Sequence, residues 1–433
     1  MSIKRALLKN TSLNLFGYFF LAVASLISIP LLLKSLGKDA FGLYLLLDSS
    51  VPLASVFDLG LSTAVIRRLS LPDQTADTKN KTWRTSFWLF IITGLITAIA
   101  AFLLLLYLGK LPIFDSYNYV YYTAIAFVLA LTIFVDRISA HLLTLPQAQQ
   151  SFTVFNIRNI IVGSGNTLFT ALLAISYPNL LAIFILQLFF YVVTAAYLLF
   201  YTRQVFKGLS ISPQKDPGIS RSLLKFGLKN FVGKVASQGE AQISKYLIGG
   251  FLSAEAIVAF GIPQSLIIKG AGAISQLPLA LFPLSTSLTA KDRILKLRRL
   301  VYSLQGLIFL VGIGGIIFIY LYGELFISLW LHNPSVVALS FPILKVLSWY
   351  FALTILTPIP TTILDSINKP QIPSFFALFT TVIEVSLLFI YIPQYGAIGA
   401  AYATTLASAI SVTIFMITSS VVFERYKNKL LSP

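Results

Sequence analysis

The chain has 433 residues, of which 57% are hydrophobic and only 11% are charged. Soluble globular domains carry about 45–50% apolar and roughly 25% charged residues, so this composition excludes that class and indicates a polytopic membrane protein. The absence of cysteine excludes a disulfide scaffold and a cysteine-ligated metal site. The net charge of +17 leaves two explanations, a nucleic-acid-binding face or a membrane topology signal. The positions of the basic residues decide between them.

Twelve stretches are long and apolar enough to cross a bilayer core as helices, at about 20 residues per crossing. In chain order they are 13–34, 41–64, 83–107, 119–143, 152–176, 179–203, 224–250, 253–280, 299–323, 336–362, 371–393 and 396–422. Their apolar runs are continuous instead of alternating, which excludes a transmembrane β-barrel. The fifth is interrupted by Arg158, Gly163 and Gly165, and the seventh carries several charges. The predicted fold class is an all-α polytopic membrane protein with about 12 transmembrane helices.

Lysine and arginine in the loops and at the ends of the chain predict the orientation. One side of the membrane holds Lys4, Arg5, Lys9, Arg67, Arg68, Lys79, Lys81, Arg84, Arg203, Lys207, Lys215, Arg221, Lys225, Lys291, Arg293, Lys296, Arg298, Arg299, Lys369, Arg425, Lys427 and Lys429. The other side holds only Lys34, Lys38 and Lys110. This asymmetry of 22 against 3 predicts that both termini are cytoplasmic. The positive charge then serves topology and contact with anionic lipid, and nucleic-acid binding loses its support.

No motif in the chain predicts catalysis or a metal site. The stretch 227–235 resembles a phosphate-binding loop but has five spacer residues instead of four, carries Val235 where Ser or Thr should bind magnesium, and lies inside a predicted span. His141 and His332 are isolated and fall on opposite sides of the membrane. We therefore expect no cofactor. We expect any energy for transport to come from a proton or sodium gradient or from downhill movement of the substrate.

The two halves of the chain resemble each other weakly. A shift of 216 residues places 14–17 on 230–233 and 36–44 on 252–260. Six helices in each half would give two lobes of the same orientation, related by an axis along the membrane normal and rocking around a central cavity. The predicted organisation is an N-terminal lobe, a cytoplasmic linker and a C-terminal lobe, at 1–203, 204–222 and 223–433.

Ionisable side chains at membrane depth normally face a cavity or a partner of opposite charge, because an isolated charge there costs about 2.5–3.5 kcal/mol or more. Five polar residues of the seventh span fall on one stripe about 120° wide. The candidate substrate-binding residues are Asn230, Lys234, Gln242, Lys245, Lys269, Lys345 and Arg158, and the candidate ion-coupling residues are Asp48, Glu240 and Glu384.

Two other interpretations of these charges remain open. They could simply neutralise each other in pairs, and Arg137 and Arg158 could extend to the cytoplasmic interface. If they line a cavity, the surplus of lysine favours an anionic ligand such as a diphosphate, whereas a drug-cation pump would need acids and aromatic residues.

Two motifs carry a family resemblance. The first runs from Leu36-Gly37 through Phe41-Gly42-Leu43-Tyr44 to Asp58-Leu59-Gly60 and Arg67, and the second is 396–403, GAIGAAYA. They resemble the polysaccharide transport branch of the multidrug/oligosaccharidyl-lipid/polysaccharide exporter superfamily, which includes O-antigen flippases.

This resemblance implies two six-helix lobes of the multidrug and toxic compound extrusion type and a central cavity. It also implies a plasma-membrane flippase of isoprenoid (undecaprenyl) diphosphate-linked oligosaccharides for polysaccharide biosynthesis. Implied partners are that lipid-linked substrate, membrane lipids, and a polysaccharide polymerase and chain-length proteins. Two alternatives remain, an ion-coupled multidrug antiporter of the same superfamily and an integral membrane glycosyltransferase or polymerase.

Overall fold

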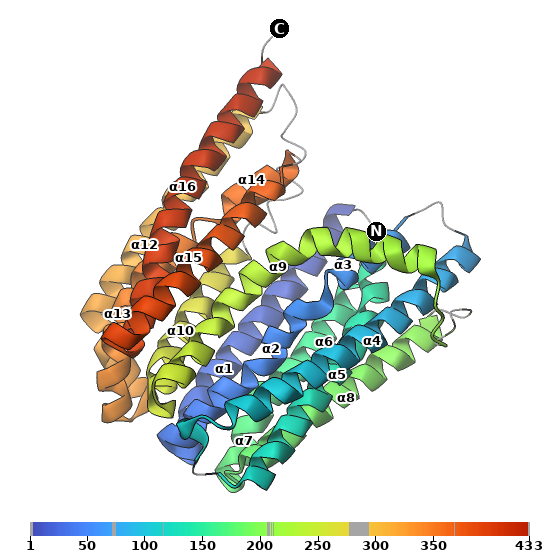
Figure 1. The fold of residues 1–433 in the computed structure, drawn as a ribbon. Helices are drawn as coiled ribbons and strands as arrows, with labels where there is room; N and C mark the ends of the chain where they lie inside the picture. Colours follow the sequence, from blue (N-terminus) through green and yellow to red (C-terminus); the bar gives the residue numbers. More distant parts are fainter. Residues whose placement is uncertain are drawn as a thin grey trace. The chain divides into compact units, whose positions relative to one another are not determined.

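The computed structural model describes residues 3–431 apart from 72–74, 116, 206–207, 209, 211, 277–293 and 368, and the side chains of 3–14, 152, 229–230 and 232–241 also lie outside the described part. Within it every regular element is a helix (Figure 1). The first elements are α1 (Ile3–Asp48), α2 (Ser50–Ser55), the 3₁₀ turn η1 (Val56–Asp58), α3 (Leu61–Leu69), α4 (Ala76–Leu108), the 3₁₀ turn η2 (Pro112–Phe114), α5 (Tyr119–Ala148), α6 (Phe152–Ser164), the π segment η3 (Gly165–Phe169), α7 (Thr170–Ser176), α8 (Leu180–Val205) and α9 (Pro217–Phe251). The later ones are α10 (Ala254–Ser275), α12 (Ile294–Leu331), α13 (Pro334–Thr354), α14 (Pro358–Ser366), α15 (Gln371–Tyr395) and α16 (Ala397–Leu431).

The helices confirm a polytopic all-α protein with about 12 crossings. Ten segments of the described residues are long and apolar enough to span a membrane. The first of them, Leu15–Asp58, has 44 residues and contains Gly37 at φ 76°, so it holds two predicted spans. At about 1.5 Å per residue it would otherwise be twice as long as a bilayer core. The charged helix α9 adds one more crossing to these, which brings the total to twelve.

The predicted second span, 41–64, is wrong as a continuous helix. It breaks after Asp48 and again at Leu59 and Gly60, which both have positive φ. The Gly60 amide donates to Oδ1 of Asp58 at 2.7 Å, which stabilises the turn. Helix α3 then continues to Leu69, beyond the predicted end.

Other predicted boundaries also change. The fifth span, 152–176, is interrupted as predicted, by the π segment η3, where Thr170 Oγ1 donates to the carbonyl of Gly165. The tenth, 336–362, is divided into α13 and α14, because Pro358 cannot continue the preceding hydrogen-bond ladder. Helix α12 begins before the predicted 299–323 and α16 ends after the predicted 396–422, because charged residues continue each helix where hydropathy does not detect it. Helix α12 also continues at its other end through the mostly apolar residues 324–331.

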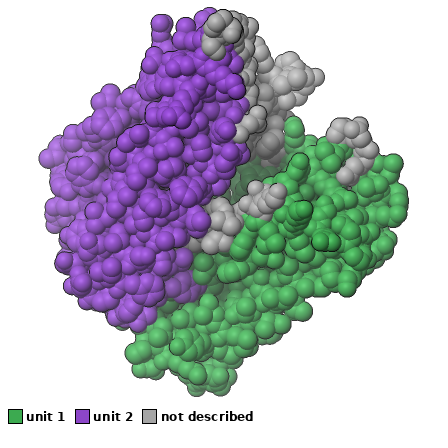
Figure 2. All heavy atoms as spheres, turned by 45° about the horizontal axis from the view of Figure 1, so that its top comes forward, with its two compact units in different colours: residues 1–242 green, residues 243–433 purple. Residues whose placement is uncertain are grey.

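The chain forms two compact units, residues 1–242 and 243–433 (Figure 2). In the first, α5 packs against α4 and α8, and α1 packs against α6 and α7. In the second, α16 packs against α15 and α13, and α13 also packs against α12 and α10. The border falls within α9, whereas the sequence predicts a linker at 204–222. The division into moving lobes at that linker stays a prediction.

Part of the predicted linker is bound to the first unit. Arg84 Nε donates to the carbonyl of Ser212 at 3.0 Å, and the Ser210 amide donates to Oδ1 of Asn80 at 3.0 Å. Asp216 Oδ1 accepts from the Ile219 amide at 2.9 Å and so caps the start of α9. The linker therefore fixes the first turn of α9 against α4.

The first half of α9 lies against the break in the second span. A Cβ on Gly60 would meet the carbonyl oxygen of Gly227 at 2.2 Å, and one on Gly227 would meet the Leu59 oxygen at 2.4 Å. Nearby, the guanidinium of Arg67 lies 4.5 Å from the centre of the Phe226 ring. Only glycine at both positions lets the two backbones approach this closely.

This contact predicts an effect of Gly227→Ala on stability. The new methyl group has only backbone to displace, so the variant should lose about 1–3 kcal/mol of stability. Gly250→Ala is the matched control in the same helix, because its Cβ meets nothing within 4 Å and alanine favours a helix by up to about 1 kcal/mol. Thermal unfolding of both purified variants in one detergent measures the difference. Equal midpoints would contradict the contact.

Candidate functional site

The first unit contains a buried ionic cluster centred on Asp136. Its Oδ2 accepts from Arg137 Nη2 at 2.8 Å, and its Oδ1 accepts from Arg158 Nη2 at 2.9 Å. The exposed fractions of the side chains are 9% for Asp136, 4% for Arg137 and 21% for Arg158. One carboxylate thus joins two guanidinium groups from α5 and α6, and the cluster carries a net charge of +1.

Both arginines of this cluster retain unused donors. Arg158 Nη1 donates to Oδ1 of Asn159 at 3.1 Å, and Arg137 Nη1 lies 3.4 Å from the Ser55 carbonyl oxygen. The Nε atoms of Arg137 and Arg158 are buried and have no hydrogen-bond partner among the described residues. A partly exposed guanidinium with a surplus positive charge and an unsatisfied donor is suited to an anionic group.

A second set of polar side chains in the first unit connects α1 to α8 and η3. Gln187 Nε2 donates to Asp48 Oδ1 at 3.1 Å and to the Tyr44 hydroxyl at 3.3 Å. That hydroxyl donates to the carbonyl oxygen of Asn166 at 3.2 Å, and Asn166 Nδ2 lies 3.5 Å from the hydroxyl of Tyr191. Asp48 therefore belongs to an extended hydrogen-bond network, as buried polar groups in a span require.

The second unit contains a buried carboxylate on α15. Glu384 is 2% exposed, and its Oε1 accepts from the Thr404 hydroxyl at 2.7 Å and from the Ser244 hydroxyl at 3.4 Å. These three residues come from α15, α16 and α9. A carboxylate surrounded by hydroxyl groups can hold a proton, and with these oxygens it can also hold a hard cation.

Lys345 lies among aromatic rings within the second unit. Its Nζ is 4.3 Å from the centre of the Phe341 ring and 5.7 Å from that of Tyr320. Trp349 Nε1 donates to the Tyr320 hydroxyl at 3.3 Å. Cation–π contacts reduce the cost of a positive charge at membrane depth.

The structure brings some of the predicted residues into these clusters. Arg158 belongs to the Asp136 cluster, Asp48 to the network with Gln187, and Glu384 to the hydroxyl cluster. Gln242, Lys245 and Lys269 are half-buried on α9 and α10. The side chains of Asn230, Lys234 and Glu240 lie outside the described residues. The roles of all ten residues in binding or coupling stay predictions.

Sequence reasoning missed the organising role of Asp136. The adjacent Asp136-Arg137 pair inside an apolar span was a signal of an ion pair. The same residues also fitted the other interpretation, in which the arginine side chains extend to the cytoplasmic interface. The buried Arg137 side chain instead bonds to its neighbour. Gln187 and Thr404 carried no comparable signal, because single neutral polar residues are common in spanning helices.

Two solved structures, a flippase and a multidrug transporter, share this fold. An inward-closed structure of the lipid II flippase MurJ matches with a TM-score of 0.74 and 15% identity, covering 96% of this chain and 90% of that one. An inward-facing multidrug resistance MATE family transporter of the MOP superfamily matches with a TM-score of 0.66 and 16% identity, covering 99% and 96%. The fold is therefore that of the MOP-superfamily transporters.

The family follows from sequence. The family model described as "Polysaccharide biosynthesis protein" matches residues 31–334, and the chain belongs to this family. A "Putative O-antigen transporter" from Shigella flexneri is 25% identical over 404 residues, covering 92% of this chain and 93% of that protein. These matches confirm the resemblance predicted from the motifs. The family and its structural neighbours are transporters and flippases, not enzymes.

The ionic cluster predicts a large effect of Asp136→Ala. The substitution leaves the buried guanidinium group of Arg137 and the partly buried one of Arg158 without their carboxylate, so the protein should lose about 3–5 kcal/mol of stability. Asp77→Ala is the control, because Asp77 forms its 2.8 Å ion pair with Lys81 at the exposed start of α4 and should cause no measurable change. Thermal unfolding in detergent distinguishes the two. An Asp136→Ala protein as stable as the control would show that the cluster does not hold α5 to α6.

Proposed function

We propose that this chain is a flippase of isoprenoid (undecaprenyl) diphosphate-linked oligosaccharides for polysaccharide or O-antigen biosynthesis. It carries the oligosaccharide unit from the cytoplasmic to the outer leaflet by alternating access. Membership of the polysaccharide biosynthesis family and the likeness to a putative O-antigen transporter over 404 residues support this proposal.

The observation that carries the proposal is the net positive cluster of Asp136, Arg137 and Arg158. A diphosphate brings negative charge into a low-dielectric region, where a preformed guanidinium pair compensates its lost hydration. Arg158 is the accessible member, with 21% of its side chain exposed. In this mechanism Asp136 holds Arg158 in place, and Arg158 contacts the phosphate or an acidic sugar.

The second unit supplies further basic groups. We propose that Lys245, Lys269 and Lys345 also bind anionic groups of the substrate, together with Asn230, Lys234 and Gln242 of the polar stripe predicted from the sequence. The isoprenoid tail remains in lipid, because its transfer into water would be unfavourable.

Glu384 is the proposed coupling group. When its carboxylate binds a proton or a sodium ion among Thr404 and Ser244, the local charge changes by one unit, which biases one facing state over the other. Asp48 and Glu240 are the further candidates. A ligand shifts such an equilibrium only by its difference in affinity for the two states.

The proposed setting is the bacterial inner membrane with both termini in the cytoplasm. The asymmetry of 22 basic residues against 3 supports this orientation. A polysaccharide polymerase and chain-length proteins are the proposed partners, because they would consume the flipped unit.

Arg158→Gln tests the substrate contact. Loss of a charge-assisted hydrogen bond costs about 1.5–3 kcal/mol, so transport should fall about 10- to 100-fold, and Arg158→Lys should retain part of it. The control is Arg203→Gln, which removes the same charge at the exposed end of α8. The measurement is the amount of lipid-linked oligosaccharide in the inner leaflet and the amount of glycan on the surface, in cells that lack the native gene and express each variant at the same level. Normal export by a well-folded Arg158→Gln protein would remove Arg158 from the site.

Glu384→Gln tests the coupling. In vesicles with an imposed proton or sodium gradient, the wild type should transport faster, and the variant should respond to neither gradient because its side chain stays neutral. Thr381→Val is a control on the same helix, one turn away from the carboxylate. A wild type that is indifferent to both gradients would exclude coupling through this acid. If the substitution Lys345→Ala increased the export of cations, the multidrug antiporter would be favoured instead.

A further inference from the structure

The cytoplasmic ends of α12 and α16 are joined by an ionic contact outside the proposed transport site. Arg298 Nε donates to Glu424 Oε1 at 2.6 Å, and Lys427 pairs with the other oxygen of the same carboxylate. The Arg298 guanidinium lies 5.3 Å from the centre of the Tyr302 ring. We call this group the ionic clasp. Its two cations and one anion leave a net charge of +1.

Further basic residues surround the clasp. Lys296 and Arg299 are exposed on the first turns of α12, and Arg425 is exposed on α16. With the clasp they form a surface that we call the basic rim, defined as Lys296, Arg298, Arg299, Arg425 and Lys427. A surface of this kind attracts phosphate groups at about 1 kcal/mol per Lys or Arg near an anionic membrane.

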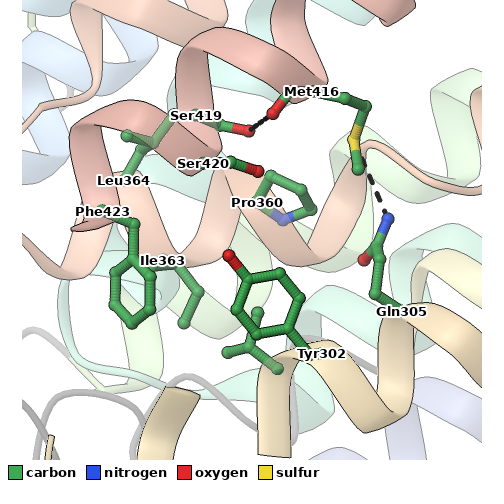
Figure 3. A pocket seen from close by; sticks show the side chains of 10 residues that line it. Tyr302, Gln305, Pro360, Ile363, Leu364, Met416, Ser419, Ser420 and Phe423 are labelled. Carbon is green, nitrogen blue, oxygen red and sulfur yellow. Dashed lines mark hydrogen bonds between the residues drawn. The ribbon is translucent and has the colours of Figure 1, made fainter. Parts of the chain in front are cut away.

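A mostly apolar pocket lies next to the clasp, between α12, α14 and α16 (Figure 3). Val301, Leu364 and Phe423 contribute apolar walls. Tyr302 extends from α12 on one side and Ser419 and Ser420 lie on α16 on the other, so hydroxyl groups border the apolar space on both sides. Tyr302 belongs to both features, because its hydroxyl lies 3.4 Å from Glu424 Oε1.

The pocket lies at the depth of a lipid head group. Residues 306–323 of α12, between Gln305 and Glu324, carry no charged or amide side chain, and these 18 residues extend about 27 Å, close to the thickness of a bilayer core. Tyr302 and Arg298 then lie about 6 Å and 12 Å beyond its edge. The polar head-group region adds roughly 5–8 Å on each side of the core. The pocket therefore begins at the interface, and the basic rim lies just beyond it.

The flanking helix is little covered by the rest of the protein. Only 11% of the most apolar window of α12 is buried within the protein, the smallest fraction among the candidate spans. Leu307 and Leu310, one to two turns deeper than Tyr302, are 57% and 65% exposed. A lipid can therefore reach the pocket from the bilayer without crossing protein.

We propose that the pocket and the basic rim form a binding site for an acidic phospholipid of the cytoplasmic leaflet. Its phosphate contacts the guanidinium and ammonium groups of the rim. The Ser420 hydroxyl donates to an ester carbonyl, the Tyr302 hydroxyl keeps its bond to Glu424, and the first part of an acyl chain fills the pocket against Val301, Leu364 and Phe423. The site shares no residue with the proposed transport clusters and does not depend on the identity of the transported glycan.

This occupant accounts for both halves of the site. A free phosphate would use the basic rim but leave the apolar walls without a partner. A zwitterionic lipid of the same chain length would use the walls but gain little from the surplus positive charge. Only a lipid with net negative charge makes use of both.

Lipid binding to the purified full-length protein tests the proposal. Native mass spectrometry in a neutral detergent would measure the affinity for dioleoyl phosphatidylglycerol and for dioleoyl phosphatidylcholine. The double variant Arg299→Gln/Arg425→Gln removes two rim charges but keeps the clasp, and should weaken phosphatidylglycerol binding about 30-fold. Ser420→Phe fills the pocket without changing charge and should weaken it at least fivefold. Phosphatidylcholine binding should change little in the double variant.

The matched control is Arg203→Gln/Arg221→Gln, which removes two exposed basic residues from the first unit. Its phosphatidylglycerol affinity should equal that of the wild type. Equal wild-type affinity for the two lipids would overturn the proposal, and so would an equal loss in the control, because binding would then reflect overall charge. Complete competition by millimolar inorganic phosphate would identify a free-anion site instead.

Discussion

A charge inside a hydrocarbon layer needs an opposite charge, and the Asp136 cluster satisfies this requirement in the first unit. One carboxylate holds two guanidinium groups, so α5 and α6 cannot separate without exposing uncompensated charge to a low dielectric. The cluster is therefore both a structural tie and the source of a surplus positive charge. Glu384 meets the same requirement differently, with hydroxyl dipoles from two other helices. The first unit thus contains a cluster of net positive charge, and the second contains a carboxylate surrounded by hydroxyl groups.

The crossings could be predicted from sequence because their cause is local. In lipid each backbone amide and carbonyl must be satisfied within its own segment, so an apolar run of about 20 residues specifies a helix by itself. The gap between the first two predicted spans contains Gly37, where φ is positive, and the weak fifth span contains the π segment. The family could be predicted because its motifs contain three turn glycines, Gly37, Gly60 and Gly396, which all have positive φ.

The remaining features depend on residues far apart in the chain. Asp136 and Arg158 are 22 positions apart, and Gly60 and Gly227 are 167 positions apart. Neither pairing leaves a periodic signal. The polar stretch before α9 predicted the boundary between the two halves. In the structure, the first half of α9 packs on the first unit through Gly227, and its second half contributes Ser244 to the Glu384 cluster. A single helix therefore contributes to two units, and the pattern of apolar and polar residues does not predict a border inside a helix.

The π segment between α6 and α7 has a consequence for how the length of this chain can change. The Thr170 backbone amide donates to the Gly165 carbonyl, five residues back, so the helix contains one residue more than a regular helix would between two fixed faces. Arg158 on one side and the buried Ala171 and Ala174 on the other keep their directions because that extra residue is absorbed locally. Loss of a single residue within Gly165–Phe169 would turn the segment into ordinary α-helix and leave both faces in place. The same deletion elsewhere in the helix would rotate everything beyond it by about 100°. The segment is therefore the one place along α6 and α7 where the length of the chain can vary without moving Arg158.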